Sequence, residues 1–213
     1  MGSLRHSLIL MLAVCAFMQT LASAKVVRVE IESTEQVAGG ESFGRSGAYE
    51  RITGRIHLEV DPDNRANRLV VDLHLAPRNE RGNVEFSTDF ELQKPVEPQR
   101  GNRRLVYFVN NRGNKASVRG AFHAGGGEDW LYRQGWSFLW CGWNCDAIVS
   151  DKRLNIYVPV VEEKGKTITG KIYAEMCSTN TRRTYSMPFY WGGSIAYPVI
   201  NLDNSHAILT VRP

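Results

Sequence analysis

LVYFVNNRGNKASVRG, residues 105–120, is the stretch that decides how the chain is interpreted. Five apolar and aromatic residues in succession, 105–109, are followed at once by the polar, turn-forming NNRGN of 110–114. A short continuous apolar run that ends in asparagine and glycine is typical of a buried strand that feeds a loop. We therefore expect a strand over 104–110 that is buried on both faces, with a functional loop directly after it.

The residues that follow predict a crossover to a second buried strand. GGGEDWLYRQGW (125–136) indicates a short helix, with acidic residues 128–129 at the positive end of its dipole and Gly135 where helices often end in a left-handed residue. The apolar run WSFLWCGW (136–143) then predicts another strand. Strand, helix and strand form one βαβ unit, so strands 104–110 and 136–142 are expected to be parallel neighbours.

The rest of the chain is predicted to be antiparallel and β-rich. Alternation is clearest at Ile56, Leu58 and Val60, whose side chains share one face of a strand. Gly, Pro, Asn and Asp between the apolar segments indicate turns. The predicted fold class is therefore α/β and β-rich, with extensive antiparallel β additions and one βαβ crossover. Further strands are expected at 26–31, 51–60, 68–76, 84–95, 153–161, 167–177 and 206–213.

The first 24 residues have the pattern of a cleaved signal peptide. A basic start precedes an apolar stretch over 8–18, and the small residues 22–24 suit a signal peptidase. Gln19 and Thr20 interrupt the apolar stretch before it reaches the roughly 18 residues that a membrane-spanning helix needs. We expect residues 25–213 to be secreted or periplasmic, with no membrane span after cleavage.

The charge balance gives no argument for a nucleic-acid partner. The chain has 26 Lys and Arg against 22 Asp and Glu, for a net charge of +4. Its short basic clusters, 103–104 and 182–183, lie far apart in mixed sequence, which favours solvated turns over a phosphate-binding patch. No DNA or RNA partner is predicted.

The cysteines and histidines do not predict a metal site or a cofactor. Cys141, Cys145 and Cys177 follow the signal peptide, so one disulfide would leave one thiol unpaired, and their number does not choose the pair. Cys141 and Cys145 have no second pair of ligands, and each histidine stands alone. We expect each histidine to be an ordinary surface or half-buried residue.

Three further motifs resemble known functional sites, and another interpretation is favoured for each. DPDNRANRLVVD (61–72) resembles a calcium loop, but Arg65 and Ala66 stand where a ligand and the turn glycine belong, so a polar turn is expected. GGSIA (192–196) lacks the second glycine of a nucleophile elbow, which disfavours Ser194 as a nucleophile. HAGGG (123–127) suits a flexible lead into the predicted helix better than an oxyanion loop.

Five segments together carry a resemblance to a known family. They resemble, in order and at sensible spacing from about residue 26 to 212, the N-terminal half of the bacterial alpha/beta hydrolase domain-containing proteins, which are exported and hydrolase-like. The segments are FGRSGAYERITGRIHLEVDP (43–62), VVDLHLAPRNERGNVEFSTDFELQKPV (70–96), RGNRRLVYFVNNRGNK (100–115), LYRQGWSFLWCGW (131–143) and YPVINLDNSHAILTVR (197–212).

The resemblance implies a division of the chain and a place for an oxyanion hole. Residues 25–103 would be β-rich, 104–145 would start an α/β-hydrolase-like sheet, and 146–213 would be a β-rich insertion. The backbone groups of Asn111, Arg112 and Gly113 would contribute to the oxyanion hole.

The same resemblance implies that the catalytic residues lie elsewhere. In this fold the serine nucleophile, the acid and the histidine follow the oxyanion loop, so they would lie downstream of Pro213. Nothing accompanies His206 that would make it a catalytic base. We therefore assign no catalytic residue, and expect 25–213 to be inactive alone and to act on a small ester-like substrate once completed.

A non-catalytic module is the alternative. In that interpretation the chain is a secreted β-rich binding or structural protein whose aromatic residues form a core or a ligand surface. The aromatic residues concerned are Trp136, Trp140, Trp143, Tyr190 and Trp191.

Overall fold

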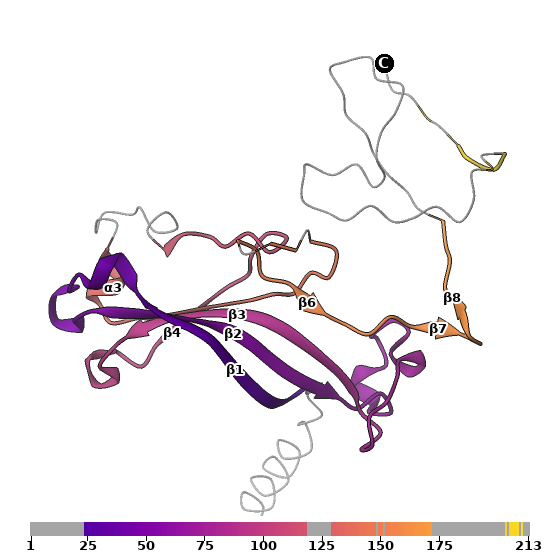
Figure 1. The fold of residues 1–213 in the computed structure, drawn as a ribbon, viewed down its shortest axis with the longest axis horizontal. Coiled ribbons are helices and arrows are strands. Elements are labelled where there is room, and N and C mark those ends of the chain that lie inside the picture. The colour runs from indigo at the N-terminus through magenta and orange to yellow at the C-terminus, as the bar shows by residue number, and fades with distance from the viewer. Residues whose placement is uncertain are drawn as a thin grey trace, which may run out of the picture.

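The computed structural model describes residues 24–118, 129–147, 149–150, 152–171, 203, 205–208 and 210. These residues are β-rich, with a mixed six-stranded sheet and almost no helix (Figure 1). The strand order is β1-β2-β3-β5-β4, with β6 also paired to β3, and β7 and β8 form a separate two-stranded sheet. The strands are β1 (Lys25–Gln36), β2 (Tyr49–Val60), β3 (Val84–Pro95), β4 (Leu105–Phe108), β5 (Ser137–Cys141), β6 (Ile156–Tyr157), β7 (Glu162–Glu163) and β8 (Lys166–Thr167).

The helical elements of the described residues are all short. The α-helix α3 (Trp130–Arg133) lies between β4 and β5 along the chain. Five single turns of 3-10 helix occupy the connections between the strands. They are η1 (Val37–Gly40), η2 (Gly44–Ser46), η3 (Arg65–Asn67), η4 (Leu73–Leu75) and η5 (Pro98–Arg100).

Three long antiparallel strands make up half of the sheet. β1, β2 and β3 each have 12 residues, and β2 pairs with β3 without interruption from Tyr49↔Pro95 to Val60↔Val84. The β1–β2 pairing shifts its register twice, between Val26 and Arg28 and between Ile31 and Ser33. At Gly54 a side chain is impossible, because its Cβ would stand 1.9 Å from the carbonyl oxygen of Glu30. The predicted strand 84–95 is confirmed at both ends.

The crossover predicted from the sequence is confirmed. β4 and β5 are parallel neighbours, with Leu105 opposite Ser137 and Phe108 opposite Trp140. α3 ends where expected, because Gly135 adopts a left-handed φ of 75°. Both strands are shorter than predicted.

The predicted burial of β4 on both faces is wrong. Val106 and Phe108 pack against the core, whereas Leu105 and Tyr107 on the other face are 52% and 50% exposed. β4 pairs with β5 alone among the described strands, and only one face of the sheet is covered there. A continuous apolar run does not reveal this difference, since both faces carry the same kind of residue.

The main core is a cluster of aromatic side chains between α3 and one face of the sheet. Phe43 stacks on Tyr132 of α3 at 4.7 Å between ring centroids, and Phe108 stacks on Trp140 at 4.9 Å. Tyr49 is fully buried among them. α3 and the segment that holds β6 lie on the same side of the sheet in Figure 1. Aromatic packing of this kind supplies large buried area from few residues.

The hydroxyl of Tyr49 ties the sheet to the crossover. It donates to the carbonyl oxygens of Tyr132 and Trp136, at 3.0 and 2.9 Å. Burial raises the pKa of Tyr49, so the phenol remains protonated and remains a donor. One buried side chain of β2 therefore fixes both ends of the turn between α3 and β5.

The predicted strand 68–76 is wrong. The chain there forms turns and η4, and Asp72 adopts a left-handed φ of 56° that no strand accommodates. Asn67 is buried before it and Leu73 after it, which anchors a compact loop rather than a strand. The alternation of apolar residues in this stretch does not reflect burial in a sheet.

The predicted strands beyond 150 are only partly correct. Of 153–161, only Ile156–Tyr157 is a strand, because it pairs with just Ser87 and Thr88 of β3. Of 167–177, residue 167 ends β8, 168–171 are outside any strand, and 172–177 lie outside the described residues. The described residues of 206–213 contain no strand.

Replacing Tyr49 with Phe is expected to lower the free energy of unfolding by about 1–2 kcal/mol, because two buried carbonyl groups lose a donor. Urea denaturation measures the change. Tyr107→Phe is the matched control. Tyr107 is half exposed, so water replaces the contacts of its hydroxyl group when that group is removed. Equal destabilisation by the two changes would contradict the anchoring role.

Candidate functional site

A buried asparagine organises the loop at the carboxyl end of β4. The Nδ2 of Asn110 donates to the carbonyl oxygen of Cys141 at 2.6 Å, and its Oδ1 accepts from the backbone N–H of Gly113 at 3.0 Å. Its carbonyl oxygen accepts from Nε1 of Trp143 at 2.6 Å. Asn110 is 2% exposed, so these bonds are formed away from water. The side chain therefore holds the ends of β4 and β5 together.

The turn that follows has a tight, left-handed geometry. Arg112 and Gly113 have φ values of 48° and 80°, and Asn111 and Asn114 exchange two backbone hydrogen bonds of 3.1 and 2.9 Å around them. The carbonyl oxygen of Gly113 accepts from Leu154 N at 3.1 Å. A Cβ at Gly113 would stand 2.8 Å from the carbonyl oxygen of Leu154. Glycine is therefore required here for both conformation and space.

The structure brings the three oxyanion-hole candidates together in this turn. The N–H of Asn111 donates to Asn114 and that of Gly113 to the side chain of Asn110. The side chain of Arg112 pairs with Asp146 at 3.0 Å. An oxyanion held by the first two N–H groups would have to replace hydrogen bonds within the loop. Their role in an oxyanion hole stays a prediction.

Several polar groups close to this turn are buried without a partner. Oδ1 of Asn144, Oδ1 of Asp146 and both polar atoms of the Asn155 side chain have no hydrogen-bond partner within the described part of the chain. Asn144 accepts from Ile156 N, next to Asn155, at 3.5 Å. Buried polar groups are normally satisfied, and these atoms are enclosed by the surrounding protein, so they do not by themselves form an accessible ligand site.

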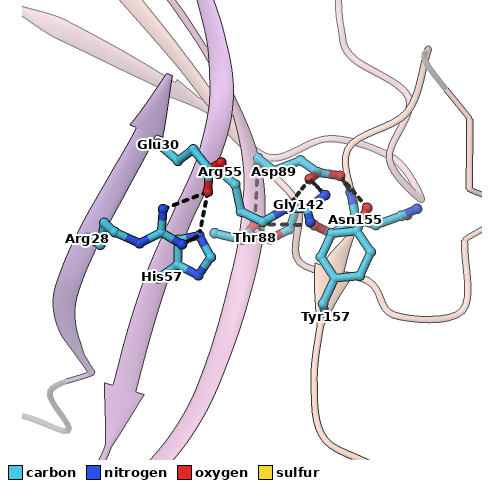
Figure 2. A network of polar contacts seen from close by, with 9 residues as sticks. All are labelled: Arg28, Glu30, Arg55, His57, Thr88, Asp89, Gly142, Asn155 and Tyr157. Carbon is cyan, nitrogen blue, oxygen red and sulfur yellow. Dashed lines mark hydrogen bonds and ion pairs between the residues drawn. The ribbon is translucent and has the colours of Figure 1, made fainter. Parts of the chain in front are cut away.

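A second polar region lies where β6 pairs with the edge of β3 (Figure 2). Asp89 of β3 accepts from Arg55 at 3.2 and 3.0 Å through Oδ1, and from Asn155 N and the Tyr157 hydroxyl, both at 3.0 Å, through Oδ2. The guanidinium of Arg55 also stacks 4.3 Å from the centre of the Tyr157 ring. All four contacts to Asp89 come from donors. The carboxylate therefore fastens β6 to β2 and β3.

Arg28, Glu30 and His57 form a triangle across β1 and β2 (Figure 2). Arg28 donates to Oε2 of Glu30 at 2.7 Å, and Nε2 of His57 lies 2.7 Å from Arg28 and 3.1 Å from Glu30. One ring nitrogen cannot accept from Arg28 and donate to Glu30 at the same time. The neutral imidazole therefore accepts from Arg28, and the protonated imidazole donates to Glu30.

This triangle depresses the pKa of Glu30. The hydrogen bond from Arg28 is the main cause, and the contact with His57 adds to it. Glu30 is solvent-accessible, so the effect weakens as salt is added.

The triangle borders an open groove of about 670 Å³. Arg28, His57 and Ser87 line the groove, with Tyr157 and Val158 as its wall at the β6 end. Arg28, His57, Ser87 and Tyr157 lie in one row across β1, β2, β3 and β6, because each is the register partner of the next. The groove therefore lies on the surface of the sheet and has both polar and apolar lining.

Only part of this arrangement is predictable from the sequence. Alternation placed His57 on the face opposite to Ile56, and its partial burial agrees with the expectation of a half-buried histidine. Its contacts with Arg28 and Glu30 depend on the shifted register of β1, which no residue pattern reveals. Asp89 and Tyr157 lie in the predicted strands 84–95 and 153–161, but no residue pattern reveals that these two strands pair with each other.

Two buried carboxylates near these regions are already paired. Glu91 contacts the ammonium group of Lys115, and Glu59 contacts Arg81 at 2.6 Å. Burial of a carboxylate is tolerated when a cation and hydrogen bonds compensate it. Both pairs therefore hold loops onto the sheet.

The remaining predicted features are as follows. Among the described residues, no group of three or more His, Cys, Asp or Glu side chains is arranged to hold a metal ion. Cys141 and Cys145 are not joined to each other. Within the same residues, no helix is long and apolar enough to cross a membrane.

Several predictions concern residues that lie outside the described part of the chain. These residues are 1–23, the HAGGG motif at 123–127, Cys177, Tyr190, Trp191 and Ser194.

Comparison of the chain with protein-family models, with curated proteins and with solved structures gave no match.

Replacing Asp89 with Asn is expected to destabilise the protein by about 2 kcal/mol, because an amide N–H₂ would face donors. Hydrogen exchange at the amide of Asn155 should accelerate, since that N–H loses its carboxylate acceptor. Asp63→Asn is the control, because the Asp63–Arg78 pair is exposed and is expected to contribute little to stability. Unchanged exchange at Asn155 would refute the fastening role.

Replacing Arg28 with Gln is expected to raise the pKa of Glu30 toward its ordinary value of 4.5, measured by NMR titration of the carboxyl group. The folded-state pKa lies below the unfolded value, so Glu30 stabilises the fold above pH 4.5, and this contribution is lost as pH falls through the folded pKa. Arg28→Gln should flatten that acid dependence. Arg51→Gln, which breaks the Arg51–Glu35 pair on the same two strands, should leave Glu30 unchanged.

Proposed function

We propose that this chain forms the N-terminal portion of an exported α/β-hydrolase-type protein whose activity is ester or related acyl hydrolysis. The strand order carries this proposal. β5 follows β4 in the chain but lies between β3 and β4, which leaves the outer edge of β4 unpaired among the described strands. A sheet that grows by right-handed crossovers would add its next parallel strand at that edge. The order β2-β3-β5-β4 therefore suits the beginning of such a sheet.

The loop after β4 supports the same function. Residues 111–113 lie at the carboxyl end of a parallel strand, where open α/β sheets bind their ligands. This position favours a ligand site at this end of the sheet.

The proposed chemistry divides between two parts of the protein. Acyl transfer needs a nucleophile within hydrogen-bond reach of a base, and donors that stabilise the oxyanion. We propose that the backbone of Asn111, Arg112 and Gly113 supplies donors, after their bonds within the loop rearrange. The serine, the acid and the histidine would come from residues that follow 213, and the substrate would be a small ester.

A non-catalytic binding module is the second candidate. The observation that favours it is the groove beside the Arg28–Glu30–His57 triangle, whose charges are mutually compensated and whose wall is Tyr157 and Val158. Such a groove suits a neutral polar ligand. The aromatic surface expected for this alternative is reduced, because Trp140 belongs to the core.

The product that the native host exports tests the proposal. We expect its intact mass to exceed that of residues 25–213, and expect it to hydrolyse short-chain nitrophenyl esters. A fluorophosphonate probe should label a serine outside 25–213, and the isolated 25–213 polypeptide should show no turnover above background.

Two results would overturn the proposal. One is an exported product with the mass of 25–213, without ester turnover, which would favour the binding module. The other is a labelled serine within 25–213, with activity abolished by its replacement with Ala.

A further inference from the structure

The loop between β2 and β3 exposes three consecutive apolar side chains. Leu69, Val70 and Val71 are 84%, 54% and 84% exposed. Such a run normally forms part of a core, and the sequence indeed predicts a strand there. Contiguous exposed apolar side chains mark interaction sites more often than isolated ones do. We call these three residues the apolar tip.

The loop beneath the apolar tip is firmly built. Asn67, 4% exposed, donates from Nδ2 to the carbonyl oxygen of Asp61 at 2.8 Å and accepts from Val70 N at 2.9 Å. On the other side Leu73 and Ala76 are buried against Val84. Both ends of the apolar tip are therefore anchored in the fold, and its exposure follows from a defined scaffold.

Two uncompensated cations accompany the apolar tip. Arg65 and Arg68 are exposed, and neither forms an ion pair with another described residue. Arg78, in the same loop, pairs with Asp63 at 2.6 Å. Asp72, directly after the apolar tip, also forms no ion pair with another described residue, so the two free cations lie only on the segment that leads into the apolar tip.

We propose that the apolar tip inserts into the interfacial layer of an anionic lipid membrane, with Arg65 and Arg68 contacting the headgroups. Three side chains are too few for a protein partner, since a stable protein interface needs about 800 Å² on each side. Partial insertion to about 5–10 Å is enough for an apolar segment flanked by basic residues. This binding is peripheral and reversible, and it is compatible with the lack of a spanning helix among the described residues.

Apolar burial and charge contribute separately to this binding. Each tip side chain gains from leaving water, and each arginine near an anionic surface adds an attraction that salt screens. The proposal therefore predicts two independent kinds of variant. Loss of the tip should weaken binding to every vesicle, whereas loss of the arginines should weaken it only on anionic vesicles.

Co-sedimentation of the full chain with phosphatidylcholine vesicles, with and without about one third phosphatidylglycerol, tests the proposal. The double variant Leu69→Asp, Val71→Asp should lower the partition coefficient at least about tenfold, because two apolar insertions are replaced by charges. Arg65→Gln with Arg68→Gln should lower it several-fold on anionic vesicles alone. The expected binding to anionic vesicles decreases with added salt.

Matched controls separate the apolar tip from the rest of the chain. Residues 8–18 are apolar and would bind vesicles by themselves, so the informative quantity is the difference between variants of the same chain. Val109→Asp, at a 71% exposed valine just after β4, should bind as the unmodified protein does. All tip positions are exposed, so unfolding curves should stay unchanged.

Three results would overturn the proposal. They are no binding to either vesicle, equal binding by the tip variant and the unmodified protein, and a change in oligomeric state in place of a change in vesicle binding. The last result would identify a protein as the occupant of the apolar tip.

Discussion

The whole sheet depends on the hydrogen bonding of β3 along both of its edges. One edge pairs with β2 over 12 residues, and the other pairs with β5 at Phe90–Gln93 and then with β6 at Ser87–Thr88. From Ser87 to Gln93 the backbone of β3 is therefore hydrogen-bonded on both sides, so its polar groups are satisfied there. Where β5 ends and β6 begins, the hydroxyl of Thr88 donates to the carbonyl oxygen of Gly142 at 2.6 Å and closes the gap. The antiparallel strands and the crossover unit are joined into one sheet by this strand.

The same face of β2 serves three purposes along its length. Tyr49 enters the aromatic core under α3, Arg55 and His57 enter the polar networks near β6, and Glu59 receives Arg81 from the loop at the far end. Alternation puts these residues on one face of β2, but each of them contacts a different segment of the chain. The core therefore fixes the sheet in which the polar groove sits, while β6 and Asp89 fix its wall.

The two regions for which we propose roles are built in similar ways and lie on different connections of the sheet. Asn110 anchors the turn after β4 through buried hydrogen bonds, and Asn67 anchors the apolar tip in the same manner. In each loop the side-chain amide of an asparagine donates to a backbone carbonyl oxygen, and that of Asn110 also accepts from a backbone N–H. Under our proposals, the first region serves an ester substrate and the second a lipid surface, so an exported enzyme would act beside a membrane.

The sequence by itself determined the β-rich class, the ends of β3, the parallel pairing of β4 with β5, and the left-handed Gly135. These features depend on local alternation, on turn residues and on the handedness of crossovers, all of which act over short distances in the chain. It also placed Asn111, Arg112 and Gly113 together at the end of β4, since they are adjacent in the chain. The strand predicted at 68–76 is wrong, because an exposed apolar run and a buried one contain the same residue types. The left-handed φ of Asp72 is also not recognisable from the sequence.

Only the tertiary structure decided which face of β4 is covered, which partners His57 has and where β6 docks. The contacts of His57 require the two register shifts of β1, and Asp89 meets Asn155 and Tyr157 across more than 60 residues of chain. Such contacts depend on long-range pairing and on the burial of side chains from distant segments. No local pattern of residues encodes them, because the same strand face is able to receive different partners.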